Sequence, residues 1–166
     1  MLMYKWTSNL EVIGYSNSNF VGCADSWKSI SGYIFILASR AISWRSAKQT
    51  LIATSTMEAE FVSCFEGTSY GVWLKNFIYG LRIMDSISKP LRLYCDNSVV
   101  AFITKNNKSG CQNKHIDIKY LAIRECVKEK KVVIEHISIE LIIADPMTKG
   151  MPSASRIMYL EWDLVL

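Results

Sequence analysis

Three carboxylates stand beside apolar stretches of the sequence, where burying a charge needs a reason. Asp96 follows "LRLYC", Asp145 follows "IIA" and precedes Pro146, and Glu60 borders the apolar face of a long predicted helix. Carboxylate oxygens are ligands that suit magnesium or manganese. Two such ions held about 4 Å apart can activate water and stabilise the leaving oxygen of a phosphodiester. The three residues are therefore compatible with nuclease chemistry.

Two of these carboxylates have an equally good structural interpretation. Asp96 could cap a helix that begins near Ser98, because a side-chain oxygen at that position accepts bonds from free backbone N–H groups. Asp145 could begin a turn or a short helix. Ends of strands in α/β sheets are also where sites form, so the residues alone leave both interpretations open.

The helical glutamates Glu58 and Glu60 must be separated by position. At about 100° per residue, Glu60 lies between Met57 and Cys64 of the apolar stripe. Glu58 is expected to point further out, to be the more exposed of the two, and to support the helix dipole. Glu60 is therefore the better candidate to reach a site beneath the helix.

The stretch "GYSNSNFVGCADSWKSISGYIF", residues 14–35, contains Asn17 and Asn19. It predicts a strand, a tight polar interruption and a second strand. The two asparagines lie where the chain leaves a buried apolar run, which places them beside the predicted carboxylate site.

Hydrophobic periodicity predicts the elements that must position these residues. The main helix is expected to bury Met57, Phe61, Cys64, Phe65, Val72 and Thr68, and a second long helix Ile116, Tyr120, Ile123 and Val127. Strands are expected over 11–20, 31–39, 41–49, 90–97 and 132–139, helices over 55–79, 98–107 and 115–130, a turn or helix broken by Pro146 over 140–150, and a last helix within 154–166. This order predicts an α/β domain with a mixed sheet and helices on its faces.

Composition suits one domain of 166 residues, half of them hydrophobic. No apolar run approaches the roughly 20 residues of a membrane span, and the N-terminal residues do not resemble a secretory signal. Five cysteines without a CxxC pair favour reduced thiols in an intracellular compartment, cytoplasmic or nuclear.

Residues 105–131 concentrate positive charge, with eight Lys or Arg against three Asp or Glu. A basic segment can bind a phosphate backbone. It can equally be a solvated helix face followed by a lysine-rich turn.

Five stretches, in order, resemble the ribonuclease H domain at the end of the Pol polyprotein of copia-type retrotransposons. They span about residues 11–151 and read "GYSNSNFVGCADSWKSISGYIF", "AISWRSAKQTLIATSTMEAEF", "LYCDNSVVA", "KHIDIKYLAIRE" and "IADPMTKG". The resemblance implies a ribonuclease H-like fold with a five-stranded mixed sheet. It also implies cleavage of the RNA strand of RNA–DNA hybrids during reverse transcription.

The resemblance further implies a site in which four carboxylates bind two magnesium ions. The family positions fall on Asn17, Glu60, Asp96 and Asp145. A basic helix near the hybrid would supply Lys114, His115, Lys119 and Arg124, although His115 could equally pack at the helix start. Implied partners are the hybrid and the reverse transcriptase portion of the same polyprotein, with no membrane.

The chain departs from the family pattern at the first of these positions. Asn17 replaces an aspartate that binds metal, Asn19 replaces a second aspartate, Phe20 a tryptophan, and "ASRAISW" lacks the usual glycine pair. An amide keeps the shape of a carboxylate but loses its charge, so metal binding and transition-state stabilisation should fall. We therefore expect an impaired nuclease. The alternatives are an active one, a non-catalytic relic that keeps the fold and binds nucleic acid, and a fragment of a larger polyprotein.

Overall fold

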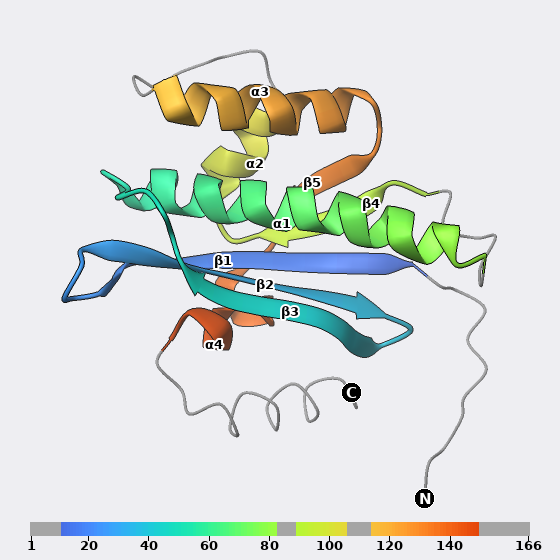
Figure 1. Ribbon diagram of the computed structural model, residues 1–166, viewed down its shortest axis with the longest axis horizontal. Coiled ribbons are helices and arrows are strands. Elements are labelled where there is room, and N and C mark those ends of the chain that lie inside the picture. The colour runs from blue at the N-terminus through green and yellow to red at the C-terminus, as the bar shows by residue number, and fades with distance from the viewer. Residues whose placement is uncertain (1–10, 83–88, 106–113, 150–166) are drawn as a thin grey trace, which may run out of the picture.

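The computed structural model describes residues 11–82, 89–105 and 114–149, and these form a five-stranded mixed sheet with helices on both faces (Figure 1). The strand order is β3-β2-β1-β4-β5. The first three strands form an antiparallel meander, and β4 and β5 run parallel to β1. The strands are β1 (Val12–Cys23), β2 (Lys28–Leu37), β3 (Arg40–Lys48), β4 (Leu91–Cys95) and β5 (Val132–His136). The predicted fold class is confirmed.

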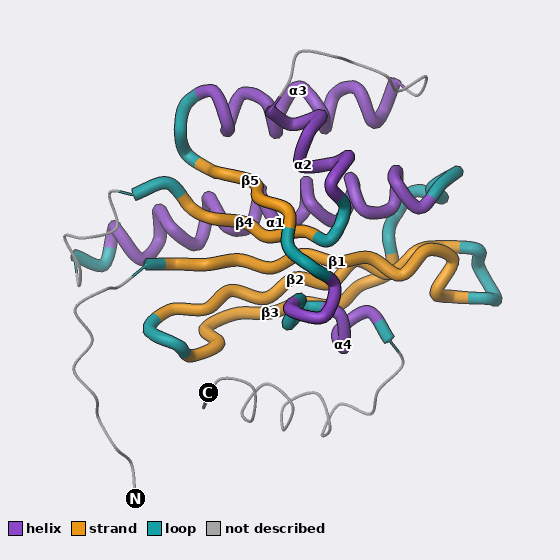
Figure 2. Tube along the Cα trace, turned by 180° about the vertical axis from the view of Figure 1, so that it is seen from behind, coloured by secondary structure: helices purple, strands orange, loops and turns teal. Residues whose placement is uncertain are grey.

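Three helices lie on one side of the sheet. The long helix α1 (Thr56–Gly80) packs on β1, β2 and β4, and α3 (Lys114–Lys128) packs on α1 and on α2 (Ser98–Lys105). The chain then passes from the end of β5, through a 3-10 turn (Ile139–Leu141), to α4 (Asp145–Thr148) on the opposite side (Figure 2). None of the described helices is long and apolar enough to cross a bilayer.

The central strand β1 is longer than the sequence predicts. Asn17 lies within it, paired with Gly32 of β2, and the turn comes only after Cys23. The predicted strand over 11–20 already contains both asparagines, and the observed strand continues three residues beyond it. The reason is pairing, because β2 pairs with β1 through Asn19 and again at Cys23 on one side, whereas β4 ends opposite Ser16 on the other. Beyond Ser16, β1 extends past β4 and leaves an open edge.

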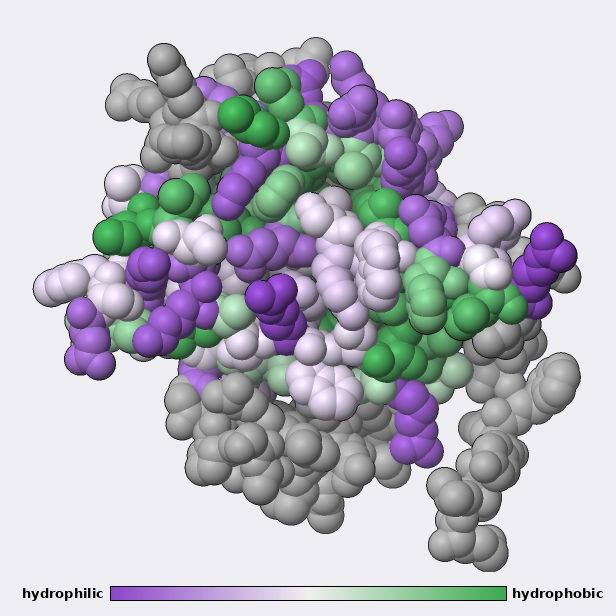
Figure 3. All heavy atoms as spheres, viewed as in Figure 1, coloured by the Kyte–Doolittle hydropathy of each residue, from purple (hydrophilic) through white to green (hydrophobic). Residues whose placement is uncertain are grey.

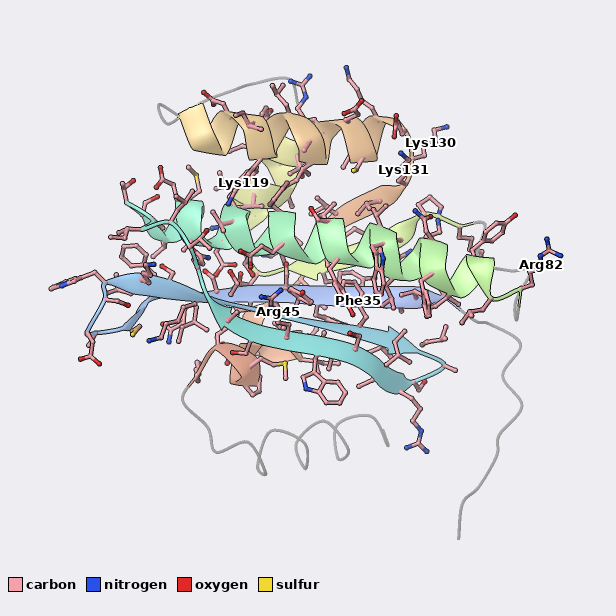
Figure 4. The ribbon with its side chains drawn as sticks, viewed as in Figure 1. Phe35, Arg45, Arg82, Lys119, Lys130 and Lys131 are labelled. Atoms are coloured by element: carbon pink, nitrogen blue, oxygen red, sulfur yellow. The ribbon has the colours of Figure 1, made fainter. Side chains whose placement is uncertain are left out.

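Helix α1 packs on the sheet through small residues that an apolar pattern does not detect. A Cβ on Gly71 would lie 2.4 Å from Leu91 Cδ2 and 2.8 Å from Phe35 Cε1, so any larger residue would force these two buried side chains to shift. In Figure 4, Phe35 lies between α1 and the sheet. The predicted core residues Phe61, Cys64 and Thr68 are buried, but Met57, Phe65 and Val72 are only partly buried. The buried face of α1 therefore differs in part from the predicted apolar face.

The remaining predictions for the elements hold with small shifts of boundary. Tyr120 and Ile123 of α3 are buried and Val127 partly so, whereas the side chain of Ile116 and the tail at 154–166 lie outside the described residues. The prediction that Pro146 breaks a helix is wrong, because Pro146 lies in the first turn of α4. Proline is tolerated there because its missing N–H would have no partner in that turn.

Candidate active site

The open edge of β1 gathers the family positions from four elements. Asn17 of β1 donates from Nδ2 to Oδ1 of Asp145 at 2.9 Å, although 128 positions separate them. Next along the strand, Ser18 donates to Glu60 Oε1 from its backbone N at 3.0 Å and from its hydroxyl at 2.8 Å. Asp96 follows the last residue of β4 and interacts electrostatically with both Glu60 and Asp145.

These groups approach from both faces of the sheet and meet past the end of β4. Side chains alternate along a strand, so Ser18 faces Glu60 of α1 whereas Asn17 faces Asp145 of α4. Within the described ranges, no three His, Cys, Asp or Glu side chains gather closely enough to hold one metal ion. The site consists of two pairs, Glu60 with Asp96 and Asn17 with Asp145.

Glu60 is a buried carboxyl with one satisfied oxygen. Its Oε1 accepts the two bonds from Ser18, while Oε2 is buried and has no hydrogen-bond partner among the described residues. Burial, and then the neighbouring charge of Asp96, raise the pKa of Glu60 to about 8. At neutral pH the carboxyl is therefore mostly protonated unless a cation replaces the proton.

Solvent exposure does not distinguish Glu58 from Glu60, contrary to the prediction. The two side chains are 9% and 8% exposed, so the prediction that Glu58 would be more exposed is wrong. Glu58 is buried because its carboxylate packs against the N-terminal cap of α1. Its Oε2 accepts from Thr54 N and Oγ1, both at 2.7 Å, and its backbone N donates to Ser55 Oγ at 3.2 Å. Hydrogen bonds therefore assign Glu58 to the helix cap and Glu60 to the carboxylate site.

Asp96 does not cap α2, because Asn97 does. Asn97 Oδ1 accepts from the backbone N atoms of Val99 at 3.0 Å and Val100 at 3.2 Å. Asp96 Oδ1 is buried and has no hydrogen-bond partner in the described part of the chain, and burial raises the pKa of this carboxyl. The two carboxylates line an open pocket of about 360 Å³ together with Thr56, Asn97 and Ser98.

Both oxygens of the Asp145 carboxylate already accept bonds from this chain. Oδ1 takes the Asn17 amide at 2.9 Å and Oδ2 takes the Lys149 ammonium at 2.6 Å. Lys149 follows Asp145 by four residues, which is the spacing of a helical ion pair. Sequence reasoning did not include Lys149, although that spacing was a usable signal.

His136 is a second residue that the sequence analysis missed. Its Nε2 lies 3.1 Å from the backbone oxygen of Asp96, and its charge favours the ionised form of the Asp96 carboxyl. It ends β5, opposite Cys95 of β4. A histidine at the end of a parallel strand was the available signal.

The predicted nucleic-acid residues lie on α3. Lys119 extends over the ring of Phe65 of α1, with Nζ 5.4 Å from the ring centroid, and Arg124 lies 5.6 Å from the ring of Tyr120. Figure 4 shows Lys119 between α3 and α1, while Lys130 and Lys131 lie at the far end of α3. Lys114 and His115 begin α3, but their side chains lie outside the described residues.

The Glu60–Asp96 pair fits a divalent cation, and the Asn17–Asp145 pair does not. Glu60 and Asp96 line one open pocket as directly interacting carboxyls, and carboxylate oxygens are the donors that hard cations require. Asp145 instead faces an amide N–H and an ammonium group, each of which competes with a metal for its lone pairs. The two-ion site that the family implies is therefore incomplete in this geometry.

Comparison with known proteins gives relatives in transposons and structural neighbours among ribonucleases. The chain is 35% identical over 139 residues to the retrovirus-related Pol polyprotein from transposon TNT 1-94 of Nicotiana tabacum, covering 84% of this chain and 10% of the relative. It is 31% identical over 150 residues to that from transposon RE1 of Arabidopsis thaliana, covering 90% and 10%. The chain thus spans about a tenth of the length of these relatives. No protein-family profile matches it.

The solved structures that are similar share the fold at low sequence identity. LC11-RNase H1, isolated from compost, superposes with a TM-score of 0.61 at 15% identity, covering 84% of this chain and 93% of that one. The same enzyme in complex with RNA/DNA hybrid gives a TM-score of 0.58 at 14% identity, covering 82% and 93%.

Proposed function

This chain belongs to the retrovirus-related Pol polyproteins of copia-type transposons and forms their ribonuclease H-like domain, and from this we propose that it binds RNA–DNA hybrids but cleaves the RNA strand poorly. The reaction class is metal-assisted hydrolysis of a phosphodiester. The residues proposed for it are Glu60, Asp96 and Asp145, with Asn17 in the position of the first metal ligand.

The hydrogen bond from Asn17 to Asp145 carries this proposal. A carboxylate at position 17 would add a negative charge to the open edge of β1 and would be free to bind a cation. The amide adds no charge, and its N–H occupies Asp145 instead. Since stabilisation of charge by positioned groups is usually the largest contribution to such catalysis, the absence of one ligand should lower the rate strongly.

Magnesium is the proposed cofactor, with Glu60 and Asp96 as the residues that would hold it. When bound, such an ion activates water and stabilises the charge that develops on the phosphodiester. Ser18 contributes by donating two hydrogen bonds to one oxygen of Glu60, which fixes the carboxyl beside the pocket.

Hybrid is the proposed substrate because two observations agree. A structural neighbour was solved in complex with RNA/DNA hybrid. Lys119, on the basic helix α3, also lies beside α1, the helix that carries Glu60. Counterions released by such residues drive binding to a phosphate backbone.

The reverse transcriptase portion of the same polyprotein is the proposed protein partner. The relatives continue for about nine-tenths of their length outside the matched region. At the end of α1, Trp73, Phe77, Tyr79 and Leu81 are at least half exposed, and apolar side chains gather there in Figure 3. If the Phe77→Glu variant binds a polymerase-containing fragment as tightly as the unmodified chain, this surface is not the contact.

A reducing intracellular compartment is proposed because the described cysteines are free thiols. A disulfide among them in protein isolated from its host cells would contradict that location.

The proposed function is tested by hybrid cleavage with four purified forms. These are the unmodified chain, Asn17→Asp, Asn19→Asp and the double variant. We expect little magnesium-dependent cleavage by the unmodified chain, restored activity with Asn17→Asp, and much less recovery with Asn19→Asp alone, because Asn19 contacts α4 rather than a carboxylate. Hybrid affinity, measured in EDTA, should be similar for all four. Absence of hybrid binding by every form would contradict the substrate assignment.

A further inference from the structure

We propose that Asn17 and Lys149 take the place of the second metal ion, so that this chain binds a single divalent cation, at Glu60 and Asp96. The inference rests on the proposed function for the location of the site. It concerns how this particular chain balances the charge of Asp145.

The charge of Asp145 is balanced by the protein itself. Each of its two oxygens accepts one hydrogen bond, from an amide and from an ammonium, so a cation would have to share both oxygens with protein donors. Lys149 alone would be a weak barrier, because its side chain is 60% exposed. The Asn17 donor is different, since that residue is only 2% exposed and lies within the central strand.

Both asparagines of β1 hold α4 against the sheet. Asn19 Nδ2 donates to the backbone oxygen of Thr148 at 3.3 Å, while Asn17 Nδ2 donates to the Asp145 side chain. An aspartate at either position could not donate these bonds and would place a carboxylate against an acceptor oxygen. Together the two amides therefore dock the short helix that carries Asp145 without any ion.

The other pair, Glu60 and Asp96, remains available to a cation. Glu60 is 8% exposed, and its Oε2 has no hydrogen-bond partner among the described residues. Asp96 Oδ1 is in the same condition, and both residues line the same pocket. The two carboxyls also interact directly. Two ionised carboxylates this close repel each other, and one divalent cation would balance both charges.

The test is the stoichiometry of Mn²⁺ binding to the full chain, measured by isothermal titration calorimetry at a pH above 8. We expect one ion for the unmodified chain and for Asn19→Asp, the matched control that adds the same charge on the same face of β1. We expect two ions for Asn17→Asp. Two ions or none on the unmodified chain, or one on folded Asn17→Asp, would overturn the inference.

A second readout covers the possibility that Asn17→Asp folds poorly. Thermal unfolding in EDTA should show this variant less stable than the unmodified chain, with the deficit recovered on adding Mn²⁺. An equal melting temperature in EDTA would contradict the docking role of the amide. Hybrid binding in EDTA keeps the two proposals apart, because one bound ion without hybrid binding would refute the proposed function and leave this inference standing.

Discussion

At the scale of single residues, the site depends on the protonation of one buried carboxyl, that of Glu60. Glu60 is fixed by Ser18 through one oxygen, and its other oxygen has no donor among the described residues. A pKa of about 8 in the folded chain, against 4.5 ordinarily, is the consequence of burial beside Asp96. This residue should therefore make the stability of the protein depend on pH.

We expect the free energy of unfolding in EDTA to fall as pH rises from about 5 to 8. In this window the folded chain keeps a proton on Glu60 that the unfolded chain has released, so the slope is negative, by at most about 1.4 kcal/mol per pH unit. The stabilising effect is complete below the unfolded pKa and disappears as pH passes the folded one. Asp96 acts in the same direction, because its pKa is also raised.

Urea unfolding of Glu60→Gln across this pH range checks the prediction. The variant should show a flatter profile and become more stable than the unmodified chain near pH 8. Glu58→Gln is the matched control, since it removes a glutamate of equal burial that serves the helix cap. Parallel profiles for Glu60→Gln and the unmodified chain would contradict the assignment of the buried proton to Glu60.

The sequence could predict some of these residues but not their partners. Asp96 and Asp145 stand at element ends, which a pattern reveals. Glu58 and Glu60 differ in their bonds rather than in their burial, and a periodicity argument cannot see bonds. His136 and Lys149 matter only because β5 and α4 return to the same edge, and that return is a property of the folded chain.

At the scale of elements, one hairpin carries a strain that its sequence does not relieve. The two-residue turn between β2 and β3 consists of Ala38 and Ser39, with φ of 52° and 60°. Positive φ at both positions favours Asn-Gly or Gly-Gly, because a Cβ is crowded in the left-handed region. The missing glycine pair noted in "ASRAISW" is therefore a structural departure with a measurable cost.

We expect Ser39→Gly to raise the free energy of unfolding by about 1 kcal/mol, which corresponds to roughly 2–4 °C in melting temperature for a domain of this size. Ala47→Gly in β3 is the control, since its φ is not positive. There the added freedom of glycine should lower stability by about 0.5–1 kcal/mol. Differential scanning calorimetry measures both, and destabilisation by Ser39→Gly would show that the turn does not hold this conformation.

Element types were predictable because they follow local patterns, whereas the packing between elements was not. The strands and helices lie close to their predicted ranges, although the apolar residues of α1 do not form one clear face. The packing of α1 on the sheet depends on Gly71, whose contribution is the absence of a side chain. The extension of β1 beyond the predicted residue 20 depends on β2, whose Lys28 pairs with Cys23.

At the scale of the whole molecule, positive charge should govern hybrid affinity. Lys119→Gln with Arg124→Gln removes two charges from α3 while keeping most of each aliphatic stem. We expect weaker hybrid binding and a slope of log affinity against log salt that is shallower by about 1 for each phosphate that is no longer neutralised. Lys130→Gln with Lys131→Gln, at the far end of α3, removes the same charge away from the site and should change both quantities less (Figure 4).

Fluorescence anisotropy with a labelled hybrid at several salt concentrations measures this difference. Equal effects of the two double variants would mean that net charge, and not position on α3, determines binding. Unchanged affinity in both would assign these charges to a solvated helix face.

The central claim is that this domain keeps the fold and the substrate surface of its family but lacks a catalytic ligand at Asn17. Single-turnover cleavage of a hybrid, with saturating protein and magnesium, tests this most directly, because binding no longer limits the rate. We predict a slow or undetectable rate for the unmodified chain and an increase of at least about tenfold for Asn17→Asp, which corresponds to about 1.4 kcal/mol of transition-state stabilisation. Rapid cleavage by the unmodified chain, with no increase in the variant, would contradict the claim.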